Sequence, residues 1–266
     1  MANSSSAVQH GLTEHGHGGD VPVQIRSERP SSTKVSDFPE ITKRDEQWRY
    51  LDALRVAGLD TNILRDASSD LAFEAPTVFT HELVGAADPL FGTAGLPEDI
   101  TSANAWGAAN QAFKITLNGE ASEAATLKIA DIKHDRAAHI IINSKTHSRG
   151  TVIIDHTGDA TLAEVVEIIV GDESELTVVS IQDWNENAVH TSAQFARIGR
   201  NAKLKHIVVS LGGKTVRVTP TAEFTAPGAE VELLGLYFAD AGQHLEHRSY
   251  VDHAVANCKS RVTYKG

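Results

Sequence analysis

Asp172-Glu-Ser-Glu-Leu176 decides the fold, because two later stretches repeat its pattern: Arg200-Asn-Ala-Lys-Leu204 and Pro227-Gly-Ala-Glu-Val231. In each stretch a turn is followed by a small residue, a polar residue and an aliphatic residue. The small residues of the three stretches lie 28 and 27 residues apart, and Ser148 and Cys258 extend the series in both directions. A repeat of this length indicates a stacked architecture.

Strand-like apolar runs separated by short turns surround this repeat. They cover residues 126–132, 138–143, 150–155, 163–170, 175–181, 189–198, 203–211, 214–220 and 229–238. A period of about 27 residues that holds two strands is too short for a propeller blade and lacks the helix of a leucine-rich repeat. The pattern therefore predicts a mainly β fold, a flattened parallel β-helix over residues 124–266 that ends without a cap.

An antiparallel sandwich with regularly spaced hairpins is the alternative fold. Against it, two-residue hairpin turns are scarce, and the one Asn-Gly pair, at residues 118–119, precedes the repeat. Within the runs, Val216 and Val218 alternate with Thr215, Arg217 and Thr219, and Val231 and Leu233 alternate with Glu230 and Glu232. This alternation predicts that each of these strands has one buried face and one face in solvent.

The first half of the chain lacks this repeat of strands and turns. Residues 1–37 have almost no apolar periodicity, which predicts a disordered tail. Residues 38–123 are expected to form a helical and irregular region, with a helix over Ile41–Leu59 capped by Thr42 and a shorter helix over residues 101–113.

Composition restricts the classes of function. The net charge of −11 argues against a nucleic-acid surface. No apolar run approaches the roughly 20 residues of a membrane span, and the first residues lack the basic and apolar regions of a signal peptide, so we expect a cytoplasmic protein with no membrane partner. The single cysteine, Cys258, excludes an internal disulfide, so that thiolate chemistry would have to be shared with a partner.

Candidate metal ligands occur in two places. His15 and His17 form a His-Gly-His run that favours solvated histidines over a weak metal site. Residues 242–260 contain several metal-ligating side chains, of which His253 and Cys258 are weak candidates. The His-x-Glu-His spacing there is one residue short of the zinc protease motifs, and on a strand these side chains alternate between two faces, so they cannot all meet at one ion.

Leu211-Gly-Gly-Lys-Thr215 ends like a phosphate-binding loop. However, Val208 stands where the motif requires glycine, and a strand follows instead of a helix. We therefore predict a tight turn between strands. No nucleophile elbow, dinucleotide fingerprint or paired-carboxylate signature occurs in the sequence, so it predicts no catalytic residues.

Two segments give the chain a family resemblance. The first, within residues 41–54, contains Arg44, Glu46, Trp48, Arg49 and Tyr50. The second, residues 243–266, contains Gln243, His244, Val251, Asp252, His253, Asn257, Cys258, Ser260, Arg261, Lys265 and Gly266. From about Phe38 onward the chain resembles the SufB/SufD family of iron–sulfur cluster assembly proteins, and the second segment is closer to the SufD type. Ala256 stands where the family usually has proline.

The resemblance implies a right-handed parallel β-helix in a scaffold subunit of the SufBCD complex, not an enzyme. It implies pairing with a SufB-like subunit, and a SufC-like ATPase that docks on a C-terminal helical domain. It further implies a transient iron–sulfur cluster at the interface with SufB, whose histidine ligand in the family lies beyond Gly266. We therefore expect a C-terminally truncated chain that holds no cofactor stably by itself.

A second hypothesis is an unrelated acidic β-helix that binds a ligand or a carbohydrate on an outer face. Such proteins usually stack sugars on exposed aromatic ladders. With three tryptophans, this chain is poorly equipped for that role.

Overall fold

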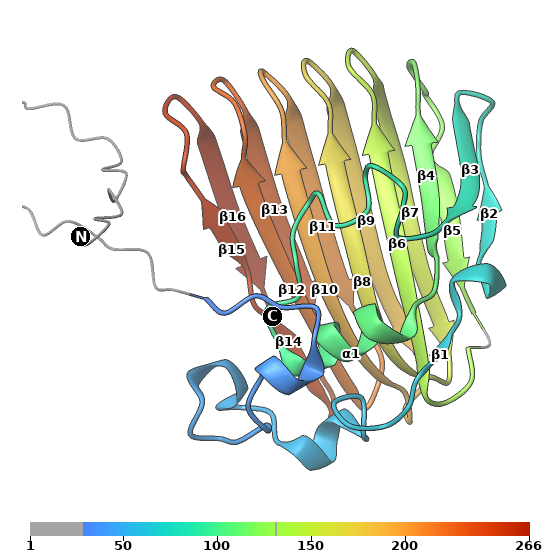
Figure 1. Cartoon of the computed structure of the whole chain (residues 1–266), viewed down its shortest axis with the longest axis vertical. Coiled ribbons are helices and arrows are strands. Elements are labelled where there is room, and N and C mark those ends of the chain that lie inside the picture. Colours follow the sequence, from blue (N-terminus) through green and yellow to red (C-terminus); the bar gives the residue numbers. More distant parts are fainter. Residues whose placement is uncertain (1–28, 131) are drawn as a thin grey trace, which may run out of the picture.

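Two facing β-sheets form the body of the protein in the computed structural model, which describes residues 29–130 and 132–266 (Figure 1). The first sheet contains β3 (Phe79–Val84), β4 (Ala112–Leu117), β6 (Arg136–Ser144), β8 (Thr161–Val170), β10 (Val189–Ile198), β12 (Thr215–Phe224) and β14 (His244–His247), with β1 (Arg65–Asp66) beside β6 and β15 (Tyr250–Asp252) beside β12. The second sheet contains β2 (Ala72–Glu74), β5 (Ala125–Ile129), β7 (Arg149–Gly158), β9 (Glu175–Trp184), β11 (Lys203–Ser210), β13 (Glu230–Tyr237) and β16 (Lys259–Lys265).

From β4 onward the chain alternates between the two sheets, so that each coil contributes strands to both. Among the described strands, neighbours are parallel throughout the stack, and only the pairs β3–β4 and β2–β5 are antiparallel. About six turns result, and the predicted parallel β-helix is confirmed. β4, which precedes residue 124, already pairs in parallel with β6.

The repeated turns lie in register along one side of the stack. Each turn has a residue with positive φ, followed by the small residue of the repeat; these turn residues are His147, Glu173, Asn201, Gly228 and Asn257. The residues after the small ones pair directly across the second sheet: Arg149 with Glu175, Glu175 with Lys203, Lys203 with Glu230, and Glu230 with Lys259. The first four small residues, Ser148, Ser174, Ala202 and Ala229, are buried between coils, where a larger side chain would not fit.

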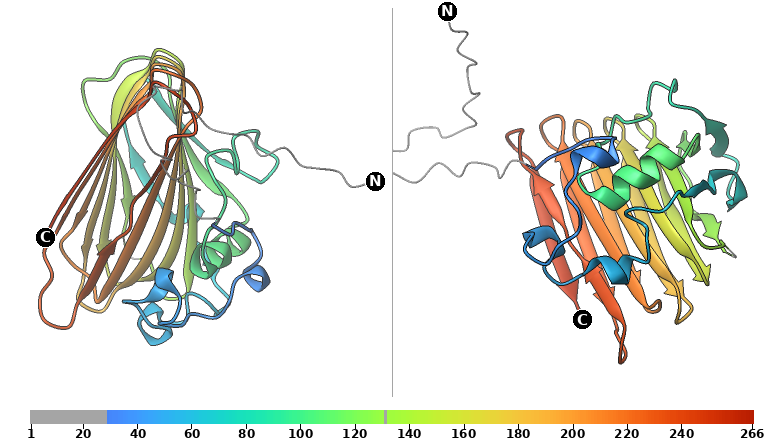
Figure 2. Two further views of the ribbon diagram at one scale, coloured as in Figure 1. Left: turned by 90° about the vertical axis from the view of Figure 1, so that its left-hand side faces the viewer. Right: turned by 60° about the horizontal axis from the view of Figure 1, so that its bottom comes forward.

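The two sheets form a wedge when viewed along the stack (Figure 2, left). They converge where the repeated turns lie and diverge toward the opposite edge, where β7 turns into β8 and β9 into β10. Aliphatic side chains such as Leu127, Ile140, Ile154, Val166 and Val218 fill the space between the sheets. The wider edge leaves room for bulkier and more polar side chains.

The segment before β1 differs from the prediction. The expected helix over Ile41–Leu59 is absent, and this prediction was wrong: the segment contains 3-10 helices at Glu46–Trp48 and Ala53–Val56. The side chains of Asp45 and Asp52, not Thr42, cap them by accepting hydrogen bonds from the backbone, and each starts a new turn. Further 3-10 helices cover Val35–Asp37 and Ser68–Asp70.

The second expected helix exists. α1 covers Ile100–Ala108, and Asp99 and Ser102 form a capping box at its start. Its predicted end was too late, because Phe113 lies on β4. α1 packs across β6, β8 and β10, and the N-terminal segment lies on the same outer face of the first sheet (Figure 2, right).

This cover changes the burial of the first sheet. Thr215 and Arg217 on β12 are fully buried, so the solvent face predicted for residues 214–220 does not exist. No described segment covers the outer face of the second sheet in this way, and Glu230 and Glu232 on β13 are partly exposed as predicted. The turn predicted at residues 211–215 is confirmed: it joins β11 to β12, and a Cβ atom at Gly212 would overlap the carbonyl group of Trp184.

Most of the predicted tail, including His15 and His17, lies outside the described residues. Its last part, from residue 29, is described: Arg29 forms an ion pair of 2.8 Å with Glu98.

Among the described residues, no helix is both long enough and apolar enough to cross a membrane.

Candidate functional site

The two motif segments, far apart in the sequence, meet at Arg217 of β12. The Arg217 Nη1 atom donates a hydrogen bond of 2.9 Å to the carbonyl oxygen of Gln47, and its guanidinium lies 3.9 Å from the centre of the Trp48 ring. Nearby, Arg248 Nη1 donates to the carbonyl oxygen of Glu46 over 3.2 Å. Residues 46–48 are therefore held against the last coils by buried charge and an aromatic ring.

Within the N-terminal motif, the residues have different environments. Trp48 is buried, and its ring packs with Leu51, Val56 and Ile100. The side chains of Arg44, Glu46, Arg49 and Tyr50 are exposed, with Tyr50 at 74%. The motif thus contains one structural anchor and a set of residues that face solvent.

The first part of the C-terminal motif surrounds Glu246. His244 Nε2 lies 3.3 Å from Glu246 Oε2, and Arg217 Nη1 lies 3.9 Å from the same oxygen. Burial opposes ionisation of Glu246, but the hydrogen bond with His244 and the charge of Arg217 outweigh it, so the pKa is lowered. Gln243 accepts a hydrogen bond from the backbone of Asp240 and stabilises the turn before β14.

The second part of this motif does not form a metal centre with the first. His253 Nε2 lies 2.8 Å from Ser260 Oγ, and Cys258 Sγ donates to the carbonyl oxygen of Ala226. Asn257 has a φ of 62° at the repeated turn, and Asp252 ends β15. In the described part of the chain, neither weak metal candidate, His253 nor Cys258, belongs to a group of three potential ligands.

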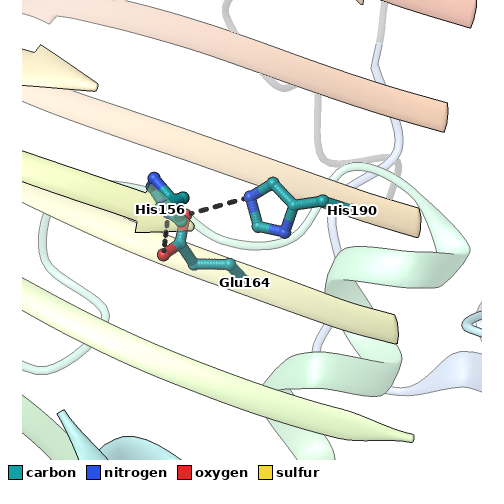
Figure 3. Close-up of side chains that lie close together, drawn as sticks. All are labelled: His156, Glu164 and His190. Atoms are coloured by element: carbon teal, nitrogen blue, oxygen red, sulfur yellow. Dashed lines mark hydrogen bonds and ion pairs between the residues drawn. The ribbon is translucent and has the colours of Figure 1, made fainter. Parts of the chain in front are cut away.

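A cluster that the sequence did not predict lies between the sheets, near the wide edge of the wedge. His156 on β7, Glu164 on β8 and His190 on β10 are fully buried, and both imidazole rings point toward the carboxylate (Figure 3). His156 Nε2 lies 3.1 Å from Glu164 Oε1, and His190 Nε2 lies 3.6 Å from Glu164 Oε2. Among residues 29–130 and 132–266, these three residues are the group that could hold a metal ion: one potential ligand atom from each lies within 4.8 Å of the other two.

Burial and charge act against each other in this cluster. Burial lowers the pKa of His190, and the nearby Glu164 offsets this only in part. Burial also opposes ionisation of Glu164, yet the charge and hydrogen bond of His156, together with the nearby His190, lower its pKa. Ser192 Oγ donates a hydrogen bond of 2.6 Å to Glu164 Oε2. The cluster is therefore a buried carboxylate whose polar partners are a hydroxyl and two imidazoles.

Hydrogen bonds extend the buried cluster along the stack. Gln182 accepts from Trp184 Nε1 and donates to Ser180, and Gln194 donates to Ser192. Beyond Gln194, His206 Nε2 lies 2.6 Å from the Gln194 side-chain oxygen. Burial, assisted by the charge of His247, lowers the pKa of His206 to about 4, so this ring is neutral near pH 7.

A second buried histidine–glutamate pair lies on the outer face of the first sheet. Glu167 Oε1 lies 2.9 Å from His139 Nε2, and the Glu167 carboxylate accepts hydrogen bonds from the backbone of Gly92 and Ala94. The Glu167 oxygens bind the backbone of the loop before α1, so this pair attaches the N-terminal region to the sheet. It offers two potential metal ligands where the inner cluster offers three.

The signal for the inner cluster was present in the sequence. Glu164 and Glu167 interrupt an otherwise apolar run at residues 163–170, and buried glutamates are rare unless they are paired. Their spacing of three places them on opposite faces of a strand. The identity of the partners, however, depends on which coils are neighbours, and this requires the register.

Comparisons with known proteins agree with the fold. The family model described as "SUF system FeS cluster assembly, SufBD core domain" matches residues 109–266. An iron–sulfur cluster assembly SufBD family protein of Mycobacterium leprae is 40% identical over 241 residues, which are 89% of this chain and 62% of the relative. One from Mycobacterium tuberculosis is 39% identical over 242 residues, 89% of this chain and 61% of the relative.

More distant relatives match a shorter part. A SufBD family protein of Staphylococcus haemolyticus is 24% identical over 110 residues, 41% of this chain and 24% of the relative. The chain spans about 62% of the length of the mycobacterial relatives. The matched region begins just before β4 and contains all the parallel coils. Because the family model matches the β-helix and the mycobacterial relatives match most of the chain, the chain belongs to the SufBD family of iron–sulfur cluster assembly proteins.

Proposed function

We propose that the chain is part of a SufD-type scaffold subunit that assembles iron–sulfur clusters in the cytoplasm, together with a SufB-like subunit and a SufC-like ATPase. The observation that carries this proposal is the SufBD core match over residues 109–266, which coincides with the coil stack. A scaffold role suits a structure in which the coils form one continuous stack and hold distant surface residues in fixed positions.

The described stack ends at an edge that is open for strand pairing. Leu233 on β13 is buried in the space between the sheets, and its register partner Val262 on β16 is 48% exposed. In the described part of the chain β16 pairs with β13, and no strand lies on its other side. Unpaired backbone groups and exposed apolar side chains at a sheet edge favour association with further strands, either of the same chain or of another subunit.

The cluster itself would be shared between subunits. Iron–sulfur clusters are usually held by four cysteine thiolates, and this sequence has one cysteine. Cys258 is half-buried and occupies the small-residue position of the repeat, next to the carbonyl group of Ala226. We therefore assign Cys258 to coil packing, and we expect the transient cluster to use ligands of the SufB-like subunit.

Co-purification with a SufB-like subunit from the same organism tests the proposal. The unaltered chain should form a stable complex with the SufB-like subunit, and reconstitution with iron and sulfide should give a visible charge-transfer band in the complex and none in the chain alone. Val262→Arg should weaken this complex, because it places a charge at the exposed end of the stack. Leu54→Arg, at a 92% exposed apolar residue of the N-terminal segment, is the matched control.

Two outcomes would contradict the proposal. If the unaltered chain does not co-purify with the SufB-like subunit, the pairing is wrong. If Val262→Arg and Leu54→Arg retain equal amounts of the subunit, the last coil is not the surface that pairs.

A further inference from the structure

We propose that His156, Glu164 and His190 form a buried site for one divalent transition-metal ion of the zinc or ferrous type. The site lies inside the β-helix, on three strands of three successive coils. It is independent of the pairing proposed above, because none of its residues lies in the last coil.

The hydrogen bonds of His190 leave one ring nitrogen available. His190 Nδ1 lies 3.2 Å from the carbonyl oxygen of Leu162, which can only accept, so Nδ1 carries the proton in the neutral ring. The Nε2 atom then presents a lone pair. It is fully buried and makes no hydrogen bond, because its contact with Glu164 Oε2, at 3.6 Å, is too long for one. A buried nitrogen without a hydrogen-bond partner is unfavourable unless another group, such as a metal ion, binds its lone pair.

His156 can present its Nε2 atom in the same way. Its Nδ1 atom lies 2.9 Å from the carbonyl oxygen of Ile181 and 3.2 Å from Gln182 Nε2. When Nδ1 donates to Ile181, loss of the Nε2 proton that Glu164 accepts leaves a lone pair for a metal ion. Histidines that bind metals commonly donate their second nitrogen to a backbone carbonyl, which fixes the ring.

The carboxylate needs a positive partner. Glu164 is fully buried, and its described partners, His156, His190 and Ser192, include no lysine or arginine. Ser192 donates to Glu164 Oε2, as groups that orient a metal-binding carboxylate do. Without an ion, only a protonated imidazole can balance the negative charge of Glu164, and a divalent cation between the three side chains can take the place of that proton.

The spacing of the donor atoms fits a small ion. Two donors bound to one zinc ion at about 2.1 Å in tetrahedral geometry lie roughly 3.4 Å apart. The two nitrogen–oxygen distances at Glu164, one to each carboxylate oxygen, are 3.1 and 3.6 Å, and one donor atom from each of the three residues lies within 4.8 Å of the other two. Two imidazoles and one carboxylate suit zinc or ferrous iron, whereas calcium and magnesium prefer sites made of oxygen.

An acidic cavity lies next to the site. It has a volume of about 620 Å³ and is lined in part by Asp159, Asp183, Glu186 and Asp240. Trp184 also lines this cavity, and its ring centre lies 5.3 Å from that of His156 and 5.2 Å from that of His190. The carboxylates attract cations to this cavity. Trp184 connects the two, because it lines the cavity and contacts both histidine rings.

Zinc binding to the chain, freed of metal with a chelator, tests this proposal. Zinc should be supplied both to the folded chain and during refolding, and binding should be measured by competition with a chromophoric chelator. We expect one equivalent to bind and to raise the thermal midpoint, and cobalt in place of zinc to give visible d–d absorption. Glu164→Gln and His190→Gln should each weaken binding about 100-fold or more.

Two controls distinguish this site from other histidines. Glu167→Gln alters the other buried histidine–glutamate pair and should leave the affinity unchanged. The double variant His15→Ala/His17→Ala, which removes the two histidines of the N-terminal run, should still bind one equivalent. Circular dichroism identifies any variant that fails to fold, and the remaining variant at Glu164 or His190 then decides.

The proposal is overturned if the unaltered chain binds no stoichiometric zinc by either route. It is also overturned if folded His190→Gln or Glu164→Gln binds zinc as tightly as the unaltered chain, or if binding disappears in the His15→Ala/His17→Ala variant. In these cases the cluster is a hydrogen-bonded proton-sharing network of the core.

Discussion

Replacing Arg217 with methionine should release the N-terminal segment from the first sheet and lower the free energy of unfolding by about 3 kcal/mol. The substitution removes the hydrogen bond from Arg217 Nη1 to the Gln47 carbonyl, and a bond of this charged type contributes about 1.5–3 kcal/mol. It also removes the cation–π contact with Trp48, worth about 2 kcal/mol when desolvated. Methionine keeps the apolar stem and restores about 1 kcal/mol through its contact with the ring.

Urea unfolding followed by tryptophan fluorescence measures this change, and limited proteolysis reports whether residues 29–64 become accessible. Arg149→Met is the matched control: its ion pair with Glu175 lies on the exposed face of the second sheet and should contribute less than about 1 kcal/mol. A loss for Arg217→Met below about 1 kcal/mol, or equal to that of the control, would refute the role of Arg217 as an anchor.

Three further predictions concern other parts of the molecule. Glu167→Gln should cost about 2 kcal/mol and increase proteolysis of residues 85–99, because an amide has one accepting oxygen for two backbone donors; an unchanged cleavage rate would contradict this. His206 has a folded-state pKa of about 4, below its unfolded value, so the unfolded state binds a proton at higher pH than the folded state does. The free energy of unfolding should therefore fall by up to about 3 kcal/mol as the pH falls from about 6.5 to 4, and urea midpoints of His206→Gln should show a shallower pH dependence. Cys258→Ala should change stability by less than about 1 kcal/mol, because alanine fills the same repeat position in two other coils; a loss above about 2 kcal/mol in urea unfolding would show a different role.

The fold was predictable because its repeat is local. Each coil has the same turn, and the small residues Ser174, Ala202 and Ala229 mark it without any knowledge of the tertiary structure. The helix over residues 41–59 was mispredicted because its apolar spacing also fits two short turns that Asp45 and Asp52 start. Spacing alone does not distinguish these two possibilities.

The candidate sites were less predictable, because they depend on which residues become neighbours. Arg217 was expected in solvent, and the cover of the N-terminal segment, which no alternation pattern shows, buries it. Likewise, His156 and His190 are separated by 34 residues, and their approach to Glu164 follows from the register of three strands. A strand pattern assigns residues to faces, but it does not say which coils stack in contact.

The in-register stacking of coils also predicts how the molecule opens. In such a stack each coil is stabilised by the coil above and the coil below, so opening begins at the ends and proceeds inward. Amide hydrogens of β16 should therefore exchange with solvent sooner than those of β8 and β10. The strands that hold Glu164 and His190 lie in the middle of the stack, where the backbone is protected longest and fraying of the terminal coils does not expose them.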